Sequence, residues 1–134
     1  MTTEPLYSFQ LPRGLLKALA LFQADSDRPA LACTSFEIRK TVGEHHELTL
    51  VSIDGRRLAS YQTEILQETL WGELPDQPQQ IVVDLSGCNK LPKVAPVDCV
   101  TVEVHEKHVE FVADKLRYTA ARLDLESSGL HFPN

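Results

Sequence analysis

A short cationic segment, Asp54-Gly55-Arg56-Arg57, lies between two stretches that are typical of β-strands. Asp-Gly is common in tight hairpin turns, because glycine adopts the positive φ that such turns need. The arginine stems can cover an apolar ligand, and the guanidinium groups can bind a carboxylate or a backbone carbonyl. The segment is therefore a candidate peptide-binding turn. The alternative is an ordinary turn whose charges keep a sheet edge soluble.

A second group of basic residues falls on two predicted helices. Arg13 and Lys17 lie one helical turn apart on the first helix, and Lys90 and Lys93 lie on the second. Basic side chains on a helix can contact phosphate groups without reading base sequence. The alternative is that each is a solvated residue on a helix surface.

The histidines and cysteines predict no metal site and no disulfide framework. His105 and His108 are three residues apart in a strand-like stretch, which predicts that they lie on opposite faces. The segment 45–47, His-His-Glu, falls on a polar hairpin tip, where we favour solvated residues over metal ligands. The three cysteines are odd in number and show no C-x-x-C spacing, which fits a reducing, cytoplasmic location.

No catalytic constellation is found in the sequence. It contains no G-x-S-x-G segment, no Walker-type loop and no G-x-G-x-x-G loop. We therefore predict a protein that is not an enzyme, with no catalytic residues, no cofactor and no metal.

Length and composition predict one globular domain over residues 1–134. The 134 residues are 43% hydrophobic and 24% charged, which is ordinary for a chain that buries a core. No apolar run is long enough to cross a bilayer, and the first ten residues lack the pattern of a secretory signal. The net charge of −6 argues against a surface coated with positive charge, so any DNA contact must be local or come from several copies.

The element order predicts a duplicated α+β architecture. Apolar alternation and helical spacing give β-α-β-β-β over residues 5–70, then a connector over 71–80, then β-α-β-β-β again over 81–134. Two such units predict a continuous antiparallel sheet with two helices on one side.

Three segments resemble the bacterial sliding clamp, the beta subunit of DNA polymerase III. Residues 7–21, YSFQLPRGLLKALAL, resemble the opening of a clamp domain, and 48–60, LTLVSIDGRRLAS, is similar to the family pattern L-x-L-V-A-T-D-G-H-R-L-A. The last 26 residues resemble the closing strands, which end in S-R-L-[IV]-x-G-x-F-P-[DN] in the family. The matching positions there are Arg122, Leu123, Phe132, Pro133 and Asn134. Arg56 departs from the family histidine, and Pro92 shortens the second helix.

The resemblance implies a DNA-clamp-like domain and a processivity role in DNA replication or repair. In the family, six such domains form a ring around duplex DNA and the helices line the hole. Weak, non-specific DNA contacts would then come from Arg13, Lys17, Lys90 and Lys93. A pocket for DNA polymerase or other clamp-binding proteins would be lined by Gly55, Arg56, Arg57 and Leu58.

Two functions follow from the resemblance. One is a clamp-like protein that forms a homo-oligomer and tethers a polymerase on duplex DNA. The other is a single-domain interaction module, an adaptor or competitor for clamp partners, that does not encircle DNA. Clamp chains of the family contain three domains each, whereas one domain is predicted here, which departs from the pattern that forms the ring. The low number of basic residues favours the interaction module.

Overall fold

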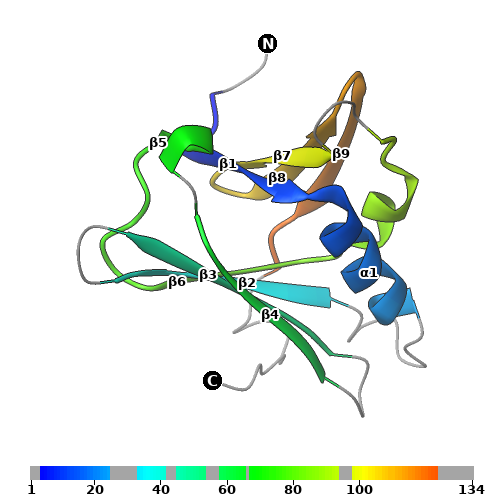
Figure 1. Cartoon of the computed structure of the whole chain (residues 1–134), viewed down its shortest axis with the longest axis horizontal. Helices are drawn as coiled ribbons and strands as arrows, with labels where there is room; N and C mark the ends of the chain where they lie inside the picture. Colours follow the sequence, from blue (N-terminus) through cyan, green and yellow to red (C-terminus); the bar gives the residue numbers. More distant parts are fainter. Residues whose placement is uncertain are drawn as a thin grey trace.

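The computed structural model describes residues 4–24, 33–41, 45–53, 58–65, 67–93 and 98–123. Strands make up most of it (Figure 1). In chain order the elements are β1 (Tyr7–Pro12), α1 (Arg13–Ala24), β2 (Cys33–Lys40), β3 (His46–Ile53), β4 (Leu58–Glu64), the 3-10 helix η2 (Gln67–Thr69), β5 (Trp71–Gly72), β6 (Gln79–Val83), the 3-10 helix η3 (Ser86–Lys90), β7 (Cys99–Val104), β8 (His108–Ala113) and β9 (Leu116–Ala121).

The strands form two antiparallel sheets, so the predicted single continuous sheet is wrong. One sheet has the order β5-β1-β7-β8-β9 and the other has the order β4-β3-β2-β6. The first strand of each half joins the sheet that holds the three later strands of the other half, since β1 pairs with β7 and β6 pairs with β2. The two sheets therefore each contain strands from both halves of the chain.

The core lies between these sheets because each sheet has an apolar inner face. In β7 and β8 buried and half-buried residues alternate, with period two, as the sequence predicted for Val100, Val102 and Val104. Phe36 of β2 and Phe111 of β8 meet edge to face, with ring centroids 6.2 Å apart. Burial of both inner faces in one cluster stabilises two packed sheets, whereas one open sheet would leave apolar side chains in water.

Helix α1 confirms the predicted first helix. Leu16, Leu19 and Ala20 lie at helical spacing and are buried. The predicted second helix is corrected to the five-residue η3, so α1 is the one α-helix within the described ranges. Leu91 already has extended backbone, as the residue before a proline prefers, and Pro92 lacks the N–H that a longer helix would need.

The predicted connector over 71–80 contains a short strand. β5 pairs antiparallel with β1, and β6 begins at Gln79. The division into 5–70, 71–80 and 81–134 stays a prediction. Within the described parts of the chain, the helices are all too short or too polar to cross a membrane.

Candidate functional site

Helix α1 and the 3-10 helix η3 pack against each other at one side of the molecule (Figure 1). Their contact is apolar, since Leu16 and Leu19 of α1 and Cys88 and Leu91 at η3 are buried. The predicted DNA-binding lysines, Lys17, Lys90 and Lys93, are all exposed on these two segments. These two segments, distant in the sequence, thus lie side by side, and we call their exposed residues the α1–η3 surface.

Charge is strongly segregated on this surface. Residues 13–24 and 86–93 together hold four of the 13 basic residues of the chain and none of its 19 acidic residues. All 19 acidic residues therefore lie outside these two segments, and the lysines can attract an anion locally.

Arg13, the fourth predicted DNA-binding residue, already has a partner. Its Nε donates to Oδ1 of Asp98 at 2.8 Å, and its backbone N–H donates to the Asp98 carbonyl at 2.9 Å. The hydrogen bond to Asp98 raises the pKa of Arg13. Arg13 thus ties the start of α1 to the segment before β7, and the three lysines are the more available cations.

Contacts with β9 hold η3 in place. The ring of Tyr118 lies over Gly87, where any Cβ would meet ring atoms at 2.3 to 2.5 Å. The Tyr118 hydroxyl donates to the Asp84 carbonyl at 2.7 Å, and the Asp84 carboxylate accepts the Ser86 backbone N–H at 2.8 Å. Burial, with the nearby charge of Asp84, raises the pKa of Tyr118. No local pattern in the sequence predicts this contact, because Gly87 and Tyr118 lie 31 positions apart.

The predicted peptide-binding turn lies mostly outside the described residues. Gly55, Arg56 and Arg57 are not described, whereas Leu58 opens β4 and is 50% exposed. β4 is an edge strand of its sheet, and Tyr61 further along it is also exposed. An exposed leucine at the start of an edge strand is compatible with a peptide-binding surface.

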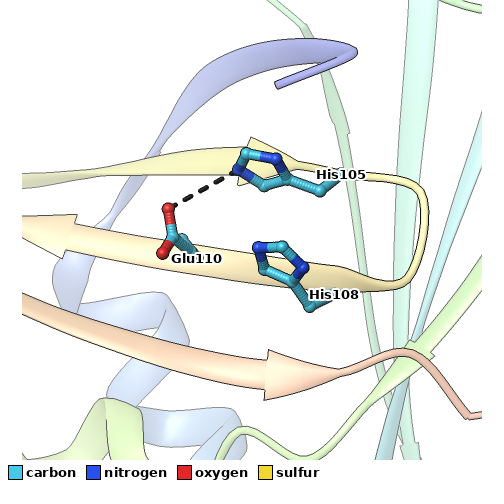
Figure 2. A group of neighbouring side chains, drawn as sticks. All are labelled: His105, His108 and Glu110. Carbon is cyan, nitrogen blue, oxygen red and sulfur yellow. Dashed lines mark ion pairs between the residues drawn. The ribbon is translucent and has the colours of Figure 1, made fainter. Parts of the chain in front are cut away.

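The prediction that His105 and His108 lie on opposite faces is wrong. β7 ends before His105 and β8 begins at His108, so a two-residue turn reverses the chain between them. The His105 N–H donates to the His108 carbonyl at 2.9 Å, and the imidazole rings stack with centroids 4.2 Å apart (Figure 2). Strand alternation does not apply across a hairpin turn, which is why the spacing argument failed.

Acidic residues on this sheet pair with an arginine of β9. Arg117 Nη1 lies 2.7 Å from both Glu103 and Glu110, which face each other across β7 and β8. Burial acts to raise the pKa of Glu110, but hydrogen bonding with Glu103 and Arg117 outweighs it and lowers that pKa. The three residues form a charged network on the outer face of the sheet.

Comparison with known proteins gives matches at the level of structure. No protein-family model and no curated protein matches this chain. The DNA polymerase III subunit beta from Pseudomonas aeruginosa matches 95% of this chain at 22% identity, with a TM-score of 0.58. The DNA polymerase sliding clamp from Bacillus subtilis matches 95% of this chain at 20% identity, with a TM-score of 0.58. The Helicobacter pylori beta clamp bound to a DNA ligase peptide matches 100% of this chain at 13% identity, with a TM-score of 0.66.

These matches show the fold and confirm the resemblance at that level. The chain has the fold of a sliding-clamp domain, and it spans about a third of the length of the clamps it matches, between 31% and 35%.

Proposed function

We propose that this chain is one domain of a sliding-clamp-like assembly that tethers a polymerase or another partner on duplex DNA. It acts in DNA replication or repair, binds DNA weakly and without sequence specificity, and is not an enzyme. The observation that supports this best is the α1–η3 surface, where three exposed lysines lie on segments free of acidic residues.

Lysines on this surface suit a loose contact with DNA. A lysine ammonium is a point charge on a flexible stem, so it can follow phosphates as a duplex moves past. Three exposed lysines in one domain give only weak attraction. Several domains around one duplex would add their contacts, which is why the proposal requires an assembly.

Assembly is proposed to use the outer edge of β4. Within the part of the chain that the structure describes, β4 pairs only with β3, so its outer backbone groups can pair with a strand of another domain. Leu58 and Tyr61 would gain apolar contacts there. The neighbouring domain could be a second copy of this chain or a domain of another protein, and it would complete a peptide pocket at Gly55, Arg56, Arg57 and Leu58.

The alternative function is a protein-interaction module that does not encircle DNA. The pairing of Arg13 with Asp98 favours it, because one of the four predicted DNA-binding cations already has a partner. In this case the turn at Gly55–Leu58 would capture partner peptides without any DNA contact.

A matched pair of triple variants tests the DNA contact. The chain has six lysines, of which Lys17, Lys90 and Lys93 lie on the α1–η3 surface. Changing these three to Gln should abolish most duplex binding, whereas the control Lys40→Gln/Lys107→Gln/Lys115→Gln, with the same change in net charge, should retain it. Fluorescence anisotropy of a labelled duplex over a range of salt concentrations is the measurement. The slope of the logarithm of the binding constant against the logarithm of the salt concentration should become shallower by about 0.9 for each lost phosphate contact, or by about 2.7 for three.

Equal loss in both triple variants would mean that net charge, and not this surface, attracts DNA. A ring further predicts retention on closed-circular DNA that is lost when the DNA is cut. If no DNA binding is seen while peptides of DNA polymerases are captured, the interaction module is the better function. Arg57→Ala should then weaken capture, and unchanged capture would remove the turn from the proposed pocket.

A further inference from the structure

The hairpin that joins β7 to β8 carries three potential metal ligands. These are His105, His108 and Glu110, whose side chains gather on one side of the hairpin (Figure 2). One nitrogen from each imidazole and one carboxylate oxygen lie within 4.8 Å of one another. Glu110 lies two residues after His108 in β8, so the two side chains project from the same face of the strand.

His105 is buried with an unsatisfied nitrogen that faces this cluster. Its exposed fraction is 6%, and among the described residues no hydrogen bond satisfies its Nε2. Oε2 of Glu110 is 3.5 Å away, at the outer limit for an interaction, and that oxygen is held at 2.7 Å by Arg117. A buried imidazole nitrogen without a partner is unfavourable, and a metal ion would supply the partner.

A pocket next to the cluster gives an ion a way in. It has a volume of about 270 Å³. Its lining residues are Glu4, Leu6, His105, Glu106, Lys107 and His108. Both histidines therefore border space that an ion and its water can occupy, and Glu4 adds a further carboxylate to the same pocket.

We propose that His105, His108 and Glu110 bind a divalent transition-metal ion of the zinc type. Two imidazoles and one carboxylate are a ligand set that Zn²⁺ accepts, with a fourth position for water or Glu4. Mg²⁺ and Ca²⁺ prefer oxygen ligands throughout, so the two histidines select against them.

Binding requires a small movement of side chains. Ligand atoms about 2.0–2.1 Å from a tetrahedral ion lie on the order of 3.3 Å apart, so the three groups must close in slightly. The rings are nearly parallel, at 11°, and one must turn for both nitrogens to face the same point. His108 is only half-buried and is the ring that turns. The backbone can stay in place, since Arg122 Nη1 donates to the His105 carbonyl at 2.9 Å.

Titration of the chelator-treated chain with ZnCl₂, in a buffer that does not bind metal, tests the site. Calorimetry should show one Zn²⁺ per chain, and Zn²⁺ should raise the melting temperature. His108→Gln and Glu110→Gln should each weaken binding by at least about tenfold. His45→Gln is the matched control, because His45 also pairs with a glutamate, Glu64, but lies next to β3 of the other sheet. It should leave Zn²⁺ binding unchanged.

Three results would overturn the proposal. The first is no Zn²⁺ binding by calorimetry together with no visible absorption when Co²⁺ is used as the probe. The second is full binding by both His108→Gln and Glu110→Gln. The third is loss of binding in His45→Gln, which would move the metal to the other hairpin. Because His108 and Glu110 are both partly exposed, their variants are expected to fold.

Discussion

Gly87→Ala is expected to destabilise the fold by disturbing the contact between η3 and β9. A Cβ at this position would lie 2.3 Å from Cε1, 2.4 Å from Cδ1 and 2.5 Å from Cζ of Tyr118. All three distances are below the shortest contacts that real Cβ atoms make. The aromatic ring, η3 or both must therefore move.

The magnitude follows from what Tyr118 loses when its ring moves. The hydroxyl gives up its 2.7 Å hydrogen bond to the Asp84 carbonyl, which is worth about 0.5–1.5 kcal/mol net. The ring also gives up its stacking on the buried Phe111, at a centroid distance of 5.9 Å, which is worth about 0.5–1.5 kcal/mol. The free energy of unfolding should fall by about 1–3 kcal/mol, and the melting temperature by roughly 3–5 °C per kcal/mol.

Urea unfolding followed by circular dichroism measures this change, with Gly14→Ala as the matched control. A Cβ at Gly14 meets no atom within 4 Å, and the residue lies in the first turn of α1. Gly14→Ala should therefore be neutral or stabilising, by up to about 1 kcal/mol. Equal stability of Gly87→Ala and the wild type would refute the reasoning that Tyr118 holds η3 in place. The proposed function adds a second readout, because displaced Lys90 and Lys93 should also weaken duplex binding.

Two further predictions concern buried polar groups. Tyr7→Phe removes the hydroxyl that donates to Oε1 of Gln79, so the free energy of unfolding should fall by about 1 kcal/mol. The exposed control Tyr61→Phe should change it by less than about 0.5 kcal/mol. Equal effects of the two variants in urea unfolding would contradict this prediction. Burial raises the pKa of Cys33 to about 11 and that of Cys88 to about 12, so in alkali the unfolded chain loses thiol protons that the folded chain keeps. This contribution to stability is complete below the ordinary thiol pKa of about 8.5 and is lost as the pH rises through 11 and 12. Between about pH 8.5 and 12, the free energy of unfolding in urea should fall less for Cys33→Ala/Cys88→Ala than for the wild type. An identical fall in both proteins would refute this prediction.

Several elements could be predicted from local sequence patterns. The apolar spacing of Leu16 and Leu19 predicted α1, and the alternation of Val100, Val102 and Val104 predicted β7 with its buried face. Both follow from short-range geometry, since a residue and its neighbours determine which side chains share a face. The resemblance to clamp domains, carried by matched segments, was confirmed as a fold.

The candidate site was only partly predictable. Lys17, Lys90 and Lys93 were identified as basic residues, but only the packing of α1 against η3 brings their segments together. The pairing of Arg13 with Asp98 joins residues 85 positions apart, and no local pattern predicts it. The predicted second helix, already expected to be shortened by Pro92, is a 3-10 turn of five residues, and the contact of Gly87 with Tyr118 that holds it could not be predicted from local sequence.

The sequence by itself determined the strands other than β5, the apolar face of β7, and the position of α1. Tertiary structure alone decided that β1 and β6 each join the sheet of the other half, that α1 packs against η3, and that His105 stacks on His108. The physical reason is the range of the interactions. Backbone preference and side-chain periodicity act over a few residues, whereas the choice of strand partners depends on burying two apolar faces together over the whole domain.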